Sequence, residues 1–221
     1  LAGTADDSAT GSWRVFAEHH GDARKKTNFS LAHSIGGADF RDNIDADNGN
    51  IAGVAVERHG SRGLDPHGLR LFGSIRGEAA AGDFDYSRAM FDATVSHGLG
   101  PRLSGALTLS AGTSGGAVPA QRLWYLGGTQ TIRGQRPGAS TGDAFWMTRL
   151  ELGTSFVGAR PVVFGDLGWA GSRDDFGSPG RPLSGAGVGA SFLDGLVRFD
   201  VARGIYPEKK VRANLYVEAR F

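Results

Sequence analysis

The chain has 221 residues, of which 36 are glycine and none is cysteine, and its formal charge is +1. The lack of cysteine excludes disulfides and thiolate metal sites, and the balanced charge gives no basic footprint for nucleic acid. No stretch approaches the roughly 20 consecutive apolar residues of a transmembrane helix, which excludes a helical membrane protein. A β-barrel stays open, because each of its strands needs only about 10 residues of alternating character.

The first half of the chain alternates between apolar and polar residues with a period of two. Successive side chains of a strand face opposite sides of a sheet, so this alternation predicts strands with one apolar face. In the last of these segments, Leu103, Leu107 and Leu109 alternate with small polar residues. Six strands are expected here: Trp13–His19, Phe29–Ser34, Ile51–Glu57, Leu69–Glu78, Tyr86–His97 and Leu103–Ser110.

The second half continues the pattern, most clearly at its end. There Val211, Leu215 and Phe221 share an apolar face, while Arg212 and Glu218 lie on the other face. A charged face opposite a wholly apolar one suits a lipid-facing exterior and a polar lumen. Five strands are expected: Asp143–Phe156, Pro161–Ala170, Leu183–Phe192, Leu196–Arg203 and Val211–Phe221. The fold class is therefore all-β, an antiparallel transmembrane β-barrel domain over residues 1–221 with about eleven strands.

The expected connections are of two kinds. Gly98–Pro101 and Tyr206–Lys209 are tight turns, whereas Gly36–Asn50, about 112–142 and Gly171–Arg181 are longer and polar. Short turns on one side and long loops on the other are typical of bacterial outer-membrane barrels. The pattern predicts a multi-pass barrel in the outer membrane, surrounded by lipid and lipopolysaccharide. The alternative is a soluble β-sandwich, which would partition into buffer without detergent.

Three short motifs follow one another in the second half. The longest loop contains Leu126–Gln135, which reads LGGTQTIRGQ; the next two strands contain RLELG at Arg149–Gly153 and VFGDLG at Val163–Gly168. This series of a glycine pair, aliphatic-Arg-Gly, a strand Glu and Phe-Gly-Asp-x-Gly resembles the bacterial surface antigen family. The family comprises the barrels of outer-membrane protein assembly factors and two-partner-secretion transporters. The end at Phe221 resembles the C-terminal sorting signature of the same proteins.

The resemblance implies that the loop of about 112–142 folds back inside the barrel with Ile132, Arg133 and Gly134 at its tip. Arg133 would then pair with Asp166 in a bidentate, charge-assisted contact, and Glu151 would lie nearby. The sequence agrees in parity, because Glu151, Phe164 and Asp166 all fall on the inward faces of their strands. The chain departs from the family at Gln135, where an aromatic residue is usual.

Strand number is a further implication of the resemblance. Barrels of this family have sixteen strands, five of them after the long loop, and usually follow periplasmic POTRA repeats. Five strands are expected after the loop here, but only about six before it, and no POTRA repeat is found. Bacterial single-chain barrels have an even number of strands, and an unpaired edge is not tolerated in lipid. Three alternatives are therefore open: one strand is missed in this count, the remaining strands and the POTRA domains lie upstream, or a second copy of the chain closes the barrel.

Enzyme and metal motifs are weak. Gly112–Gly116 contains Ser114 in a G-x-S-x-G pattern, but a nucleophile elbow needs a strand, turn and helix, and no helix is expected there. Asp45–Gly49 faintly resembles the start of a calcium loop, yet residue 56, where a bidentate Glu belongs, is valine. The histidines lack metal-ligand spacing. No enzymatic activity, metal or cofactor is expected.

The expected function is insertion of outer-membrane proteins or translocation of a polypeptide, with an unfolded or partly folded client as partner. The free edges of the first and last strands could template a client strand by β-augmentation. One alternative is a two-partner-secretion pore for a single dedicated client. The other is a passive anchor for an upstream secreted or enzymatic domain. The upstream sequence would discriminate them, because several POTRA repeats favour assembly and two favour secretion.

Overall fold

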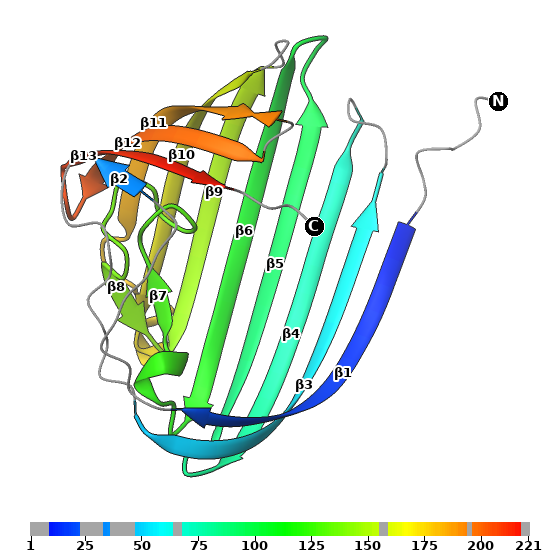
Figure 1. Cartoon of the computed structure of the whole chain (residues 1–221), viewed down its shortest axis with the longest axis vertical. Coiled ribbons are helices and arrows are strands. Elements are labelled where there is room, and N and C mark those ends of the chain that lie inside the picture. The colour runs from blue at the N-terminus through cyan, green and yellow to red at the C-terminus, as the bar shows by residue number, and fades with distance from the viewer. Residues whose placement is uncertain are drawn as a thin grey trace.

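A computed structural model describes residues 9–22, 33–35, 47–63, 68–154, 159–193 and 196–217. Its main feature is an antiparallel eleven-stranded sheet in the order β1-β3-β4-β5-β6-β9-β10-β11-β12-β13-β2. Figure 1 shows this sheet curling into an open barrel wall. The strands are β1 (Ala9–Asp22), β2 (His33–Ile35), β3 (Gly49–Arg62), β4 (Arg70–Gly82), β5 (Tyr86–Gly98), β6 (Leu103–Gly116), β9 (Ala144–Thr154), β10 (Arg160–Gly171), β11 (Leu183–Phe192), β12 (Val197–Tyr206) and β13 (Val211–Val217).

The all-β antiparallel fold is confirmed, and all eleven expected strands have a counterpart, although most are longer than expected. The difference that matters for the loop lies at β6, which continues to Gly116, so the long loop starts at residue 117 rather than about 112. The stretch Gly112–Gly116 looked like loop because its residues are small, but it pairs with Tyr86–Met90 of β5. Alternation persists there, since Ser114 is buried and Thr113 exposed.

The segment expected as Phe29–Ser34 takes an unexpected place in the sheet. Its described part, β2, pairs with Ala213–Leu215 of β13 rather than with the strands next to it in sequence. It does not lie between β1 and β3, because these two strands pair with each other along their whole lengths, from Ala9 with Arg62 to Asp22 with Gly49. Residues 29–32 and the expected signature residue Phe221 lie outside the described residues.

The two ends of the sheet carry different connections. Residues 23–48, 83–85, 117–143, 172–182 and 207–210 join strands at one end, while 63–69, 99–102, 155–159 and 193–196 join them at the other. The three long connections thus lie at one end together with two short turns, one of them the expected turn Tyr206–Lys209, and the other end has only the shorter connections. Over the described residues, no helix has the length and apolar character needed to cross a membrane.

Burial is inverted with respect to a water-soluble protein. On β12, Arg198 and Asp200 are 2% and 0% exposed, whereas Phe199 between them is 39% exposed. The same alternation leaves Val163 of β10 and Leu215 of β13 about half exposed on the outer face. Charged residues are almost never fully buried unless paired. The inward charges must therefore have partners, and the long loop supplies one of them.

Candidate functional site

The loop of residues 117–143 folds against the inner face of the sheet. Its arms form a two-stranded ribbon, β7 (Trp124–Leu126) with β8 (Ser140–Gly142). At the tip, Ile132 is fully buried and packs in a cluster with Leu126, Phe145, Ala170 and Leu183. This apolar cluster fixes the depth at which the next residue, Arg133, enters the inner face.

The tip turns sharply just after Arg133. Gly134 has φ +83°, a left-handed conformation that side chains other than glycine rarely adopt. A side chain at this position would also come within 2.6 Å of the backbone of Arg203 and Gly204 in β12. Gly134 therefore lets the tip turn while it lies directly on the barrel wall.

Arg133 and Asp166 form the central contact. Nε and Nη2 of Arg133 donate to Oδ2 and Oδ1 of Asp166 at 2.7 and 2.6 Å. The backbone N–H of Arg133 also donates to Oδ2, at 2.9 Å. The two side chains are 0% exposed, so three hydrogen bonds to one carboxylate hold the tip in a place that water does not reach.

Further charged groups of the wall surround this pair. Arg133 Nη1 donates to Glu151 at 2.5 Å and lies 3.7 Å from Asp200. Arg198 donates to the same Glu151 at 2.8 Å and to Asp200 at 3.0 Å. The guanidinium of Arg133 lies over the ring of Phe164, with 3.5 Å between the guanidinium carbon and the centre of the ring. The cluster thus links β9, β10 and β12 through one loop residue.

The cluster balances its charges. Carboxylates at Glu151, Asp166 and Asp200 face Arg133, Arg198 and Arg149, whose Nε lies 3.7 Å from Asp166. The hydroxyl of Tyr216 on β13 donates to Asp200 at 2.7 Å. Removing one partner of a buried ion pair leaves an uncompensated charge, which typically costs about 3–5 kcal/mol. Withdrawal of Arg133 would leave the buried carboxylate of Asp166 without its main cation.

Strand β11 makes room for the cluster with three inward glycines. A side chain at Gly185 would overlap the carbonyl oxygen of Arg133, and one at Gly189 would overlap the carboxylate of Asp200. Between them, a side chain at Gly187 would come within 2.7 Å of the Phe164 ring. The glycines form a shallow furrow in which the loop tip lies and across which β10 and β12 reach each other.

The base of the loop is held by the neighbouring strands β5 and β6 and by Asp47. Trp124 Nε1 donates to the hydroxyl of Ser114 on β6 at 2.9 Å, and the Arg88 guanidinium of β5 lies 4.0 Å from the centre of its ring. Asp47 exchanges three hydrogen bonds with the 3-10 turn Ala120–Arg122. Ser114 of the G-x-S-x-G pattern and Asp47 of the segment Asp45–Gly49 therefore contact the loop. Asp45 and Ala46 lie outside the described residues.

The structure brings together Ile132, Arg133, Gly134, Glu151, Phe164 and Asp166, the residues selected from the sequence. Sequence reasoning missed Arg198, Asp200 and Tyr216 as members of the cluster. Their inward parity was visible in the alternation, but nothing in the sequence showed that β12 and β13 lie across β11 from Arg133. Gln135 is also part of the site, with contacts to β11 and the β12–β13 turn.

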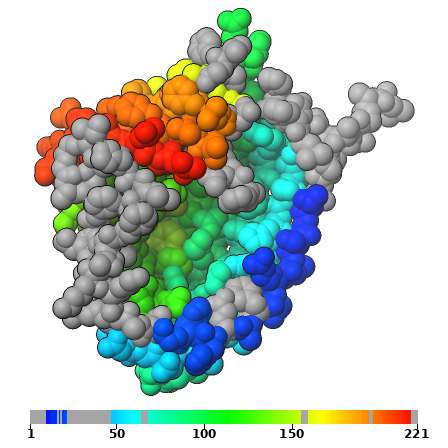
Figure 2. Space-filling model, in the orientation of Figure 1, coloured from blue at the N-terminus to red at the C-terminus, as the bar shows by residue number. Residues whose placement is uncertain are grey.

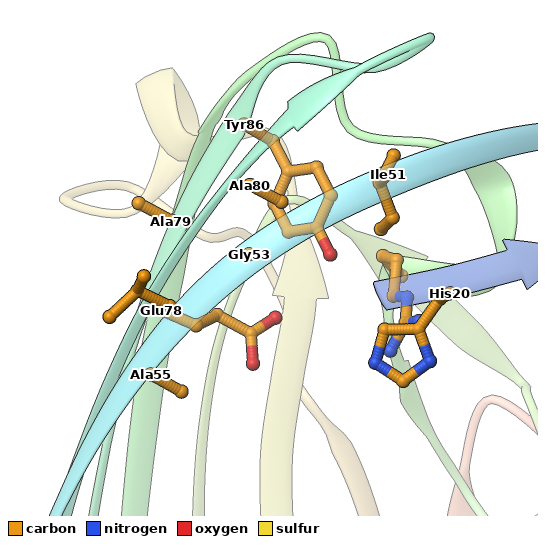
Figure 3. A pocket seen from close by; sticks show the side chains of 10 residues that line it. His20, Ile51, Gly53, Ala55, Glu78, Ala79, Ala80 and Tyr86 are labelled. Carbon is orange, nitrogen blue, oxygen red and sulfur yellow. The ribbon is translucent and has the colours of Figure 1, made fainter. Parts of the chain in front are cut away.

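A second candidate site on the inner face is small. Figure 3 shows the inner pocket where Ile51, Glu78 and Tyr86 gather beside His20. Its volume of ≈ 20 Å³ holds about one water molecule. Within the described ranges, no group of three or more His, Cys, Asp or Glu side chains could hold a metal ion. The arginine cluster is therefore the principal candidate site.

Comparison with known structures shows barrels of the same fold. CdiB from Acinetobacter baumannii matches with a TM-score of 0.63 and 16% identity, over 76% of this chain and 33% of that one. BamA from Haemophilus ducreyi lacking POTRA domains 1–3 matches with a TM-score of 0.62 and 16% identity, over 76% of this chain and 43% of that one. The chain thus spans less than half the length of either structure.

Sequence comparison identifies the family. No curated protein matches the chain, but the family model of the haemolysin secretion/activation protein ShlB/FhaC/HecB matches residues 65–192. That range is more than half of the 221 residues and includes Arg133, Glu151 and Asp166. The expected kinship with assembly-factor and two-partner-secretion barrels is confirmed. The chain belongs to the ShlB/FhaC/HecB family of haemolysin secretion/activation proteins.

Proposed function

We propose that this chain is part of an outer-membrane pore that secretes a polypeptide, and that the loop of residues 117–143 gates the pore. The observation that carries the proposal is the fully buried Arg133–Asp166 pair, which holds this loop against the inner face of a barrel wall. Membership of a haemolysin secretion/activation family favours secretion over insertion as the activity.

The distribution of polarity supports a place in the outer membrane. Trp13 and Val15 on β1, Ile75 on β4 and Val188 on β11 are all more than half exposed. Large exposed apolar surfaces mark membrane or protein contacts, and barrels alternate apolar-out with polar-in. Outer-membrane barrels have their longer loops on the extracellular side. The end with the long connections therefore faces outside and meets lipopolysaccharide.

The inner face suits passage of an extended chain. Figure 2 shows the wall of residues 50–120, in cyan to green, as the floor of a deep hollow. Polar and charged groups line it, among them Arg76, which bonds Glu57 at 2.6 Å and Glu78 at 3.0 Å. The loop lies on one side of this space, so its displacement would widen the path. The family resemblance adds upstream POTRA domains as the receptor for the client.

The proposal is tested with the full-length protein and its client in proteoliposomes. Client added on the POTRA side should become protected from protease in the lumen of the vesicle. Protein with Asp166→Ala should conduct ions more readily in planar bilayers, because the loop no longer blocks the lumen. Extraction of the protein into buffer without detergent, or client that stays accessible to protease, would contradict the proposal.

Insertion of other outer-membrane proteins is the second candidate function. It is favoured by the edge of β13, where the described residues of the short strand β2 pair with Ala213–Leu215. A client strand could extend the sheet there by β-augmentation. Cross-linking from β13 to a folding client barrel would support insertion. Cross-links found only to an extended client inside the lumen would leave secretion as the function.

A further inference from the structure

Gln135, next to the Arg-Gly tip, is only 1% exposed, and its amide has three hydrogen bonds. Its Nε2 donates to the carbonyl oxygens of Ser184 at 2.8 Å and Glu208 at 3.1 Å. Its Oε1 accepts the backbone N–H of Glu208 at 3.2 Å. Ser184 lies in β11, and Glu208 lies in the turn between β12 and β13. One side chain thus joins the loop tip to the last hairpin.

The side chain of Glu208 strengthens the same junction. Its carboxylate lies 3.3 Å from Nε of Arg136 in the loop and accepts from Nη2 of Arg212 on β13 at 2.7 Å. Gly204 permits this close approach, because a side chain there would come within 2.7 Å of the Gln135 amide and overlap the carbonyl oxygen of Glu208. Loop, turn and both strands of the hairpin meet at this point.

The chemistry of the junction requires an amide. Only a side chain with two donors and an acceptor can bond two carbonyl oxygens and one backbone N–H at once, and a primary amide has this set. An aromatic side chain, which the family usually has at this position, lacks the set, since even tyrosine has a single O–H donor. The buried site of Gln135 therefore differs in kind from an aromatic packing site, and it attaches the tip to a part of the wall that Arg133 does not contact through its side chain.

We propose that Gln135 and Glu208 form a latch that joins the loop tip to the β12–β13 turn. Because of this latch, the tip leaves the inner face only together with that turn. The inference deepens the proposed gating and rests on it. It names the element of the wall that moves with the gate, while the Arg133–Asp166 pair and the hydrogen bond from Gln135 to Ser184 of β11 are the contacts that break.

Amide hydrogen exchange tests the latch itself. In the full-length protein, Gln135→Met keeps the approximate size of the side chain but removes all three bonds. The Glu208 amide should then exchange about fivefold faster or more, the factor expected for one hydrogen bond. Gln121→Met is the matched control, since this loop glutamine makes the same exchange of bonds with the backbone of Asp47. It should leave the Glu208 amide unchanged.

Two cross-links test which contact breaks during transport. The chain contains no cysteine, so pairs can be introduced without background. A short thiol reagent joins either Arg136→Cys with Glu208→Cys, across the latch, or Gln130→Cys with Arg149→Cys, between the loop and β9. In the native structure Arg149 donates to the Gln130 carbonyl at 3.2 Å. The latch cross-link should leave client translocation unchanged, and the β9 cross-link should stop it.

The outcomes separate the inference from the proposed function. Arrest of translocation by the latch cross-link would overturn the inference, because tip and turn would then have to part. Unchanged exchange of the Glu208 amide in Gln135→Met would overturn it as well. Translocation that continues with the β9 cross-link would instead contradict gating by the loop. The exchange measurement would still decide whether the latch exists.

Discussion

The two halves of the wall carry similar ladders of inward charges but bury them to different extents. In β3–β5, Arg76 and Arg88 alternate with Glu57 and Glu78, and Arg76 is 38% exposed. In β9–β12, Asp166 and Asp200 are 0% exposed, and Asp166 pairs with the fully buried loop residue Arg133. The difference is the loop, whose tip covers the second ladder, whereas on the first ladder it contacts Arg88 through Trp124. The alternation of residues in a strand thus determines which side chains face inward. The loop that lies over these side chains determines how strongly their charges interact.

Burial changes the energetic weight of similar contacts. Exposed ion pairs contribute about 0–1 kcal/mol because water screens them. A buried pair costs far more to break, because the remaining charge has no solvent. The uncovered half can therefore line a path for a client, and the covered half can hold a gate closed. Four predictions test this division.

The largest effect is expected for Arg133→Ala. It leaves Asp166 buried without its cation, so loop docking should weaken by about 3–5 kcal/mol. Protease digestion of the protein in outer-membrane vesicles should then cleave the loop of residues 117–143, whereas the wild-type loop should resist cleavage. Arg76→Ala in the uncovered ladder is the control and should leave the loop protected. Equal cleavage in both variants would remove the distinction between the halves.

Next in size is the reciprocal exchange of charges, Arg133→Asp with Asp166→Arg. A simple pair would be restored by this exchange. Here the new carboxylate at 133 would face Glu151 and Asp200, which lie 2.5 and 3.7 Å from Arg133 Nη1. The double variant should thus recover loop protection only in part, and adding Glu151→Gln should recover more. Full recovery by the exchange alone would show that the cluster acts as an isolated pair.

A smaller loss is expected for Gly185→Ala, in the glycine furrow. The added methyl group overlaps the Arg133 carbonyl, and overpacking of this kind costs about 1–3 kcal/mol. Gly165→Ala on neighbouring β10 is the matched control, because a side chain there meets no atom within 4 Å. Cleavage of the loop should rise in the first variant alone. A protected loop in Gly185→Ala would show that the tip does not need the furrow.

The smallest effect is expected in the uncovered half. Glu78→Gln weakens the contacts with Arg76 and Arg88, at 3.0 and 3.2 Å, but Arg76 is 38% exposed, so water screens its contact more than it screens those of Arg133. The barrel should lose no more than about 1 kcal/mol of stability, measured as the shift in unfolding temperature on gels of unheated samples. A shift as large as that of Asp166→Ala would mean that the first ladder is also covered.

The sequence by itself determined the strands and their faces. Alternation placed Glu151, Phe164 and Asp166 inward, because parity in a strand is fixed by backbone geometry and does not depend on neighbours. The resemblance of the sequence to a family motif located the tip residues Ile132, Arg133 and Gly134. Boundaries were less secure at β6, where small residues such as Gly112 and Ser114 belong equally well to strand or loop.

Only the tertiary structure decided which residues of distant strands and of the loop contact each other. That Arg198 and Asp200 share a cluster with Arg133 follows from the register of β10, β11 and β12, which local sequence does not encode. The place of β2 beside β13 and the three bonds of Gln135 likewise depend on elements far apart in the chain. Which distant strands pair depends on the arrangement of the whole sheet. Which way each side chain faces is decided within its own strand.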